Sequence, residues 1–480
     1  MRFLFLLIAV AGALIPLSGQ SYEHVIVTAD SFVSSFAPLG QYIASELGLS
    51  DTTVTVEYIY SHSPGRDNPE RIRNFIRYAY ANWGTTHVLL GGDDDILPCR
   101  KGWVDASHIV EPLKDTIPTD LYFSDLDGDW DRDGDGLFGE TEDSVDLYPD
   151  VHVARMPASR AGTVSLLVDK FLTYCADSSA AYLRNVLLAG FDIAHDPEAI
   201  GEVTLELYDS AYVSPGMKPC TKVYDSHPGN HRSAVLAALN AGQHIYIQWD
   251  HGNTNAYGCG WLNHNWTIGN GDVYALTNGP RYSIFVAAGC LTGHFDGMDC
   301  ILENALCAPN GGAVAGTGNS RCGVMDGRTP QRKYTAFMIE GFVRALFSHA
   351  GPADLTDFTT NRARAAPLAD TNLIYRWSDY CMNLMGEPAM PVWVPGATGV
   401  AEPARPAGQV VDRAWPSHVL GSLVLRGKEP LIMTDALGRN IMRLEPGTNS
   451  LERVPAGVYF LRTAGHSGRF MGRIVKVSEE

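Results

Sequence analysis

A histidine and a cysteine in this chain each follow a short apolar segment that is typical of a buried strand. His251 follows residues 244–249, and Cys290 follows residues 282–288. In open α/β sheets the functional groups gather beyond the carboxyl ends of the strands, so we expect these side chains to meet although they lie far apart in sequence. An imidazole that stabilises a thiolate is the minimum apparatus of a cysteine peptidase. The pair therefore predicts such a site.

Two glycines flank this predicted reactive pair. Gly252 lets the backbone N–H after the histidine come close to a substrate, and Gly289 does the same before the cysteine. The N–H of Cys290 could then serve as an oxyanion donor. Taken one at a time, the two motifs also fit a plain turn and a small buried apolar side chain. Their combination favours catalysis.

An acidic segment, residues 131–142, has the spacing D-x-D-x-D-G-x5-E of a calcium-binding loop. The predicted ligands are the side chains of Asp131, Asp133, Asp135 and Glu142 and the backbone carbonyl of Leu137. Gly136 permits the sharp turn, and Asp125, Asp127 and Asp129 could add ligands or form a second site. The flanking residues do not look helical, so we expect a structural Ca2+ loop without the usual helices. The alternative is an acidic loop that is simply solvated.

Strand-like segments alternate with helix-like segments from residue 24 to about residue 320, which indicates α/β units with largely parallel sheets. The expected strands are residues 24–29, 54–60, 87–91, 186–190, 244–249, 282–288 and 313–316. The expected helices include residues 69–83, 163–175, 233–241 and 298–308. The loop-rich residues 99–157 should separate an N-terminal α/β unit from a second unit that carries His251 and Cys290.

The composition is that of an ordinary globular protein with several domains. The chain has 480 residues, of which 45% are hydrophobic and 19% charged, and a formal net charge of −18. This acidity argues against nucleic acid or an anionic membrane surface as a partner. Residues 1–20 combine a basic start, an apolar core and small residues for cleavage, as signal peptides do. No later segment has the apolar length of a transmembrane span, so we expect an exported, soluble protein.

Nine cysteines are an odd count for an exported chain. Oxidising surroundings allow up to four disulfides with one thiol left over, and that thiol could be the nucleophile. Parity alone does not identify which cysteine this is. None of the cysteine spacings resembles a zinc site.

The composition of the sequence changes after Trp393. Residues 396–409 are rich in Pro, Gly and Ala, which is typical of a linker. Residues 410–480 combine short alternating strands with turn signals. This pattern predicts a small antiparallel β-sandwich at the C-terminal end.

The motifs around His251 and Cys290 resemble the catalytic region of the gingipain family of cysteine peptidases. The similar residues are Asp250-His251-Gly252-Asn253 with Ala256-Tyr257-Gly258, and Val286-Ala287-Ala288-Gly289-Cys290-Leu291-Thr292-Gly293-His294-Phe295. The resemblance implies two adjacent caspase-like α/β subdomains, residues 21–157 and 158–395, with the catalytic dyad in the second. The roles that it implies are those of His251 as general base or imidazolium partner, Cys290 as nucleophile, the N–H groups of Gly252 and Cys290 as oxyanion hole, and Asp192 as the carboxylate that orients the histidine.

Further segments resemble landmarks of the same family over about residues 24–395. They are Val88-Leu89-Leu90-Gly91-Gly92-Asp93, Val153-Ala154-Arg155-Met156-Pro157 and Leu384-Met385-Gly386-Glu387-Pro388-Ala389-Met390. Ala154 stands where the family usually has Gly, and Glu387 stands where it has Asp. Residues 432–439, 455–460 and 472–477 resemble a type IX secretion sorting domain. That resemblance implies export machinery as a partner and a secreted or cell-surface location.

These observations predict a secreted cysteine endopeptidase that acts on proteins or peptides through an acyl-enzyme. A thiol transpeptidase that processes secreted proteins would use the same acyl-enzyme, and the sequence does not separate transfer from hydrolysis. A non-catalytic, calcium-dependent surface-binding module is the alternative from another class. The side-chain specificity also stays open, because Asp296 and Asp299 could either recognise a basic side chain or cap the following helix.

Overall fold

The computed structural model describes residues 21–395 with short gaps, and most of residues 418–476. The residues that it does not describe are 1–20, 111–112, 144, 146, 194–199, 261–263, 327–329, 348–352, 355–361, 363–364, 396–417, 420–421, 426–429, 436–438, 452, 456, 464–469 and 477–480. The predicted signal peptide and linker therefore lie outside the described residues. The chain divides into two compact units, Met1–Pro403 and Ala404–Glu480. None of the described helices has both the length and the apolar character needed to cross a bilayer.

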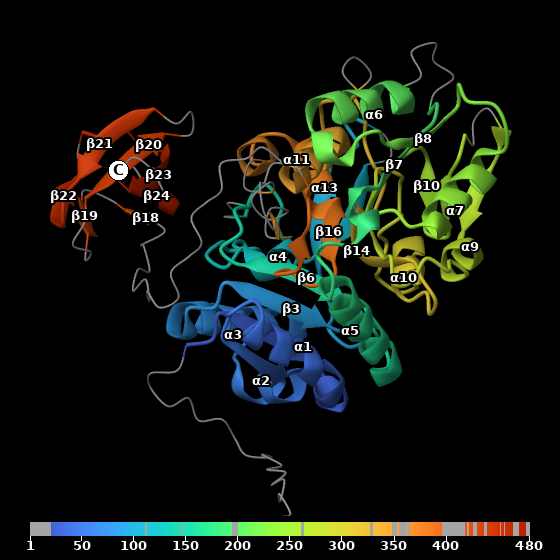
Figure 1. Cartoon of the computed structure of the whole chain (residues 1–480). Coiled ribbons are helices and arrows are strands. Elements are labelled where there is room, and N and C mark those ends of the chain that lie inside the picture. Colours follow the sequence, from blue (N-terminus) through green and yellow to red (C-terminus); the bar gives the residue numbers. More distant parts are fainter. Residues whose placement is uncertain are drawn as a thin grey trace, which may run out of the picture. The chain divides into compact units, whose positions relative to one another are not determined.

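The first unit is built around one sheet of ten strands (Figure 1). In order along the sheet the strands are β2 (Asp51–Thr55), β1 (His24–Thr28), β3 (His87–Gly91), β6 (His152–Met156), β16 (Met382–Met385), β14 (Ala313–Asn319), β13 (Ser283–Ala287), β9 (Ile245–Trp249), β7 (Val186–Gly190) and β8 (Thr221–Tyr224). Neighbouring strands are parallel except β16 and β14, which run antiparallel. β16 lies between β6 and β14, so it joins the N-terminal strands to those from the middle of the chain. The sequence predicted sheets in two adjacent subdomains, and in the structure the strands of both form one continuous sheet.

Seven of these strands, β1, β3, β7, β9, β13, β14 and β16, are buried along their whole length. The strands of a parallel sheet are buried in this way when helices cover both faces of the sheet. Each fully buried Val, Ile or Leu side chain contributes about 1.5–3 kcal/mol to the stability of the fold. The helices that the structure describes in this unit are η1 (Asp30–Phe32), α1 (Val33–Ser45), α2 (Val56–His62), α3 (Asn68–Trp83), α4 (Leu121–Ser124), α5 (Ala161–Cys175), η2 (Ala181–Arg184), α6 (Ile200–Ala211), η3 (Pro215–Met217), α7 (His231–Ala241), α9 (Asn270–Tyr274), α10 (Ile301–Leu306), α11 (Thr335–Phe347) and α13 (Leu373–Cys381). The mainly parallel α/β architecture predicted from the sequence is confirmed.

The strand expected at residues 54–60 is wrong. The extended segment ends at Thr55, and Val56–His62 forms α2, with the Thr55 side chain capping the start of the helix. Val56 and Ile59 are buried three residues apart, which is the spacing of a helix face. The β-branched and aromatic residues of this segment favoured a strand, and the packing of one helical face outweighed that preference.

Several short elements were not expected from the sequence. Residues 99–157, predicted as loop-rich, contain β6, α4 and a hairpin of β4 (Arg100–Asp105) and β5 (Lys114–Thr119). β8 and β16 have only four residues each, too few for a clear periodic pattern. A two-stranded sheet pairs β15 (Ala353–Asp354) with β17 (Pro391–Val392).

The second unit consists of strands in the described residues. A five-stranded sheet has the order β18 (His418–Val419), β24 (Phe470–Lys476), β23 (Gly457–Thr463), β20 (Leu431–Asp435) and β21 (Asn440–Leu444), and β19 (Ser422–Leu425) pairs with β22 (Gly447–Ser450). Its small core consists of Leu431, Met433, Leu444, Leu451, Tyr459 and Leu461. The packing of the two sheets into a sandwich stays a prediction.

A buried histidine on β1 ties distant parts of the first unit together. His24 Nδ1 lies 2.7 Å from Asp51 Oδ1 on β2, and its Nε2 lies 3.1 Å from Glu387 Oε1. Burial by itself lowers the pKa of His24, but the two carboxylates raise this pKa to about 9. Glu387 follows β16, so this contact helps to hold β16 within the N-terminal part of the sheet.

We expect His24 to stabilise the fold most at low pH. Because its pKa of about 9 in the folded chain exceeds the ordinary value of 6.5, the stabilisation is fully present below pH 6.5 and is lost as the pH rises through 9. The full effect is about 3 kcal/mol. Urea unfolding of the wild type and of His24→Gln should show a stability difference that shrinks across this range. Exposed His108, changed to Gln, is the control, and a His24→Gln difference that is independent of pH would contradict the expectation.

Candidate active site

His251 and Cys290 lie in the loops that follow two adjacent parallel strands. β9 ends at Trp249 and β13 ends at Ala287, and the two strands are paired with Ala287 opposite Gln248. Their carboxyl ends therefore reach the same edge of the sheet, and both side chains line one pocket there. The residues that line this pocket are Ile193, Trp249, Asp250, His251, Ala288, Cys290, Gly323, Val324, Met325 and Thr335.

Two glycines let the histidine and cysteine loops touch. A Cβ added to Gly289 would lie 3.0 Å from both N and Cα of Gly252, and one added to Gly252 would lie 3.1 Å from the carbonyl O of Cys290. A larger residue at either position would push the loops apart. Leu291, directly after the cysteine, has a φ of 58°, a left-handed conformation that is uncommon for residues other than glycine. Such backbone strain is often found at functional sites.

Hydrogen bonds hold His251 from both sides. Its Nε2 lies 2.8 Å from the carbonyl O of Ile193, in the loop after β7, so Nε2 is the nitrogen that donates. Its backbone N–H donates to Asp250 Oδ1 at 2.6 Å, and Oδ2 of the same carboxylate accepts from the Gly260 N–H at 2.9 Å. The segment between them forms a small sheet of β10 (Gly252–Asn253), β11 (Ala256–Gly258) and β12 (Thr267–Gly269). With Nε2 donating, Nδ1 is the ring nitrogen that carries the lone pair.

Cys290 lies against the segment that follows β14. Its Sγ is 3.8 Å from the carbonyl O of Gly323, and the Leu291 N–H donates to the Arg321 carbonyl at 2.9 Å. This pairing of the two segments brings Cys322 beside Cys290. Like the other cysteines of the chain, both are free thiols in the structure.

The two neighbouring thiols shift each other's pKa in opposite directions. The hydrogen bond with Cys322, and then burial, raises the pKa of Cys290 well above its usual range. The same hydrogen bond lowers the pKa of Cys322 to about 6. A negative charge in this pair therefore needs a nearby cation to place it on Cys290. His251 lines the same pocket as Cys290.

Asp192, predicted to orient His251, lies in the same loop as Ile193. It is buried, and its backbone N–H donates to Asp225 Oδ2 at 2.6 Å. The carbonyl of Ile193, which the sequence did not single out, is the group 2.8 Å from His251 Nε2. The orienting role of the Asp192 carboxylate stays a prediction.

His294, the other histidine near the cysteine, is engaged elsewhere. Its Nε2 lies 3.0 Å from Asp296 Oδ1, and its Nδ1 lies 3.2 Å from the hydroxyl of Thr254. Asp296 also contacts Arg321 at 2.8 and 2.9 Å and Lys101 at 2.8 Å. Burial by itself raises the pKa of Asp296, but these cations hold that pKa well below its usual range. Asp296 is therefore already neutralised by basic side chains of the chain itself.

Neither Asp296 nor Asp299 caps the helix that follows. The N-cap of α10 is Cys300, whose N–H donates to Glu303 Oε2 at 2.7 Å. Among the described residues that line the pocket, Asp250 is the sole carboxylate, and both its oxygens accept backbone N–H groups. The described lining thus offers mainly apolar side chains to a substrate.

The acidic loop brings three of its predicted calcium ligands together. Oxygen atoms of Asp131, Asp133 and Asp135 lie within 4.8 Å of one another. Gly134 and Gly136 have φ values of 77° and 86°, which allow the sharp turn between them. These carboxylates accept hydrogen bonds from the backbone N–H groups of Gly136, Asp135 and Leu137.

The charge of this loop is only partly compensated. Asp131 forms an ion pair with Arg66. Although burial by itself raises it, hydrogen bonds from the loop backbone and from Arg66 hold the pKa of Asp131 below its usual range. Burial, and then the charges of Asp135 and Glu142, raise the pKa of Glu140. Glu142 itself is exposed and accepts a hydrogen bond from the neighbouring threonine at 2.7 Å. A bound cation would relieve the remaining repulsion.

Two side chains near the pocket, Asn319 and Cys322, were not singled out from the sequence. The Asn319 side-chain amide donates to two carbonyl groups just before Cys290, at 2.9 and 3.2 Å, and so fixes the end of β13. Both residues follow the strand expected at residues 313–316. The rule that functional groups gather beyond strand ends could therefore have found them.

Comparison with known proteins places this chain in a family. A family model described as Peptidase family C25 matches residues 18–393. Over 258 residues, 52% of this chain, the sequence is 28% identical to Lys-gingipain of Porphyromonas gingivalis, of which the matched part is 13%. The chain thus spans only a small part of the length of this relative.

Two solved structures share the fold. One is described as the Arg specific cysteine proteinase gingipain R, with a TM-score of 0.58, 16% identity, and coverage of 96% of this chain and 98% of that one. The other, described as a protease, has a TM-score of 0.59 and 16% identity over 94% of this chain and 96% of that one. The shared architecture is a caspase-like α/β fold with a large, mainly parallel sheet. Since the family match covers most of its length, the chain belongs to peptidase family C25.

Proposed function

We propose that the chain is a cysteine-type endopeptidase, with Cys290 as nucleophile and His251 as its partner. The observation that carries the proposal is that both side chains follow adjacent strands and line one pocket. Membership of peptidase family C25 supports it. The substrates would be proteins or peptides.

In the proposed reaction His251 takes the proton of the thiol. Its Nε2 donates to the Ile193 carbonyl, so Nδ1 accepts the proton of the Cys290 thiol, and the resulting imidazolium stabilises the thiolate that this transfer leaves on Cys290. The thiolate attacks the peptide carbonyl, and the N–H groups of Gly252 and Cys290 are the proposed donors to the oxyanion. The imidazolium then protonates the leaving amine, and a water molecule activated by the histidine hydrolyses the thioester.

Incubation of the purified full-length chain with a peptide library, followed by mass spectrometry, tests this proposal. We expect cleavage inside the peptides, and loss of cleavage after the thiols are alkylated. Cleavage that survives complete alkylation would rule out a thiol nucleophile. An added amine in the same reaction separates hydrolysis from acyl transfer, because transfer would yield an amide-linked product.

We also propose that the protein is secreted or displayed on the cell surface. The signal-peptide pattern of residues 1–20 and the sorting-like segments of residues 410–480 support export, with the export machinery as the partner of the C-terminal unit. That unit is compact and has its own apolar core in the described residues, as a separate sorting module would.

A further proposal is that the acidic loop binds one structural Ca2+. The predicted ligands are Asp131, Asp133, Asp135, Glu142 and the carbonyl of Leu137. The convergence of the three aspartates within 4.8 Å supports this ligand set. The ion would neutralise the loop and stabilise the fold, and it would take no part in the proposed peptide cleavage.

Removal of calcium should lower the melting temperature. An ion that binds only the folded chain stabilises it by about 2.7 kcal/mol when its free concentration is 100 times Kd. Calorimetric melting with a chelator, and after Ca2+ is added back, measures the effect. Asp133→Ala should lose both the calcium dependence and saturable calcium binding, while Asp177→Ala, an exposed aspartate elsewhere, should keep both. Unchanged binding in Asp133→Ala would leave only a solvated acidic loop.

A further inference from the structure

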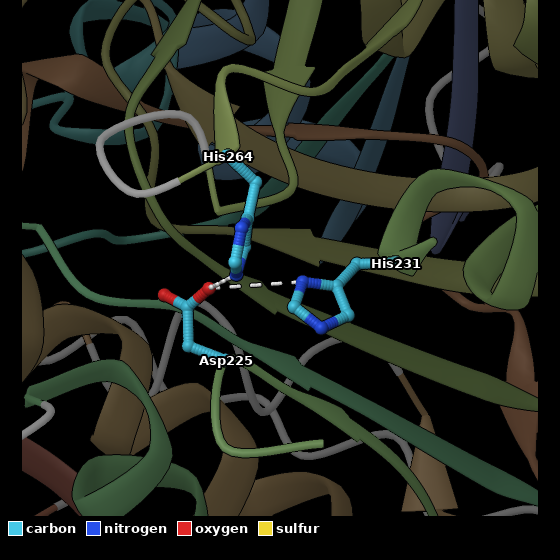
Figure 2. Close-up of side chains that lie close together, drawn as sticks. All are labelled: Asp225, His231 and His264. Carbon is cyan, nitrogen blue, oxygen red and sulfur yellow. Dashed lines mark ion pairs between the residues drawn. The ribbon is translucent and has the colours of Figure 1, made fainter. Parts of the chain in front are cut away.

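Two histidines and an aspartate, His231, His264 and Asp225, form a cluster in the first unit (Figure 2). Asp225 follows β8, His231 begins α7, and His264 precedes β12. Asp225 Oδ1 lies 3.6 Å from Nδ1 of His231 and 3.3 Å from Nε2 of His264, and Figure 2 shows both rings turned toward this carboxylate. We propose that these three side chains bind a divalent transition-metal ion of the zinc class.

The separations fit a tetrahedral metal site. Zinc binds histidine nitrogen and carboxylate oxygen at about 2.0–2.2 Å, so its ligand atoms lie about 3.3–3.5 Å apart. Two separations in the cluster are 3.3 and 3.6 Å, and all three ligand atoms lie within 4.8 Å of one another. Two imidazole nitrogens with one carboxylate oxygen suit Zn2+ better than Ca2+ or Mg2+. The His264 side chain is 38% exposed, which leaves room for a solvent ligand at the fourth position.

His231 has the tautomer that a metal ligand needs. Its Nε2 lies 2.9 Å from the carbonyl O of His227, a group that only accepts, so Nε2 carries the proton. Its Nδ1 is buried and forms no hydrogen bond with any described residue, and the 3.6 Å to Asp225 is too long for one. A buried nitrogen whose lone pair faces a carboxylate is unfavourable unless a cation lies between them.

Gly260 keeps the centre of the cluster open. A Cβ at this position would lie 2.6 Å from Asp225 Oδ1 and 3.3 Å from His231 Nδ1, so any side chain would fill the space between the ligand atoms. Trp266 holds both imidazoles, because it stacks on His264 with ring centroids 4.8 Å apart and meets His231 edge-on at 5.2 Å. The ligands are therefore oriented by their surroundings.

Two sets of hydrogen bonds join the cluster to the active site. Asp225 Oδ2 accepts from the Asp192 N–H at 2.6 Å, and the carbonyl of the next residue lies 2.8 Å from His251 Nε2. On the other side of the cluster, the Gly260 N–H donates a hydrogen bond to Asp250, the residue directly before His251. The ion would thus have a structural role, since it would fix the two loops on which the position of His251 depends. No step of the proposed peptide cleavage passes through it.

Zinc titration of the full-length chain, first freed of metal by a chelator, tests the proposal without any measurement of peptidase activity. Calorimetry and metal analysis should show saturable Zn2+ binding, and Co2+ should give the intense visible absorption of a tetrahedral site. Asp225→Asn preserves shape and the bond from Asp192, and His264→Ala removes an exposed ligand. Each variant should bind Zn2+ at least 100-fold more weakly, with an unchanged circular dichroism spectrum.

Three matched variants separate this site from other metal-binding groups. Asp133→Ala changes the acidic loop, Cys290→Ala removes the pocket thiol, and His108→Ala removes an exposed histidine elsewhere. All three should keep the zinc affinity of the wild type. Absence of saturable zinc binding in the wild type, or wild-type affinity in His264→Ala, would overturn the proposal. In either case a protonated His231 that pairs directly with Asp225 would account for the cluster.

Discussion

Replacement of Cys290 by alanine should abolish peptide cleavage while leaving the fold intact. Without the thiolate no acyl-enzyme forms, and loss of a nucleophile of this kind lowers kcat by about a million-fold. Cys290 lines the pocket, so its truncation removes one sulfur atom from a cavity wall. The measurement is kcat/KM on the best library peptide, together with the melting temperature.

The other cysteines supply the controls for this prediction. An active-site alkylating probe should label Cys290 in preference to the other eight cysteines, and Cys220→Ser, which lies near Asp209 on α6, should keep wild-type activity. Cys322 is the rival nucleophile, because its pKa is lowered to about 6. If Cys290→Ala were active and Cys322→Ala inactive, the assignment would move to Cys322.

Replacement of His251 by alanine should reduce activity by about 10⁴-fold at neutral pH. A thiol without an imidazole partner has a pKa near 8.5 and is mostly protonated at pH 7. The hydrogen bond with Cys322, and then burial, raises the pKa of Cys290 further. The residual activity of the variant should therefore rise with pH over a range in which the wild type is already active. A pH profile of kcat/KM for both proteins measures this difference.

His294→Ala is the matched control for this histidine. Its ring is held by Asp296 and Thr254, and it is not among the residues that line the pocket. We expect near wild-type kcat/KM in this variant. An inactive His294→Ala together with an active His251→Ala would reverse the assignment of the base.

The sequence by itself predicted the elements whose signals are local. A strand buried on both faces needs a continuous apolar run, so β9 and β13 were predicted within a residue or so of their observed ends. Because chemistry gathers beyond such ends, the same runs predicted that His251 and Cys290 meet. The calcium spacing and its turn glycines are local as well, and three of the aspartates do converge. The helix at residues 56–62 was missed because its residue types favour a strand when taken one by one.

Only the tertiary structure decided which distant segments lie side by side. It inserted β16 next to β6, placed Glu387 against His24, and put Cys322 beside the predicted nucleophile. It also put a backbone carbonyl, which no side-chain pattern can reveal, against His251 Nε2. Asp225, His231 and His264 carry no motif spacing, and they meet because β8, α7 and the loop before β12 pack together. Such neighbours follow from the order of the strands and the packing of the loops, which depend on contacts between residues far apart in the chain and leave no periodic trace in the sequence.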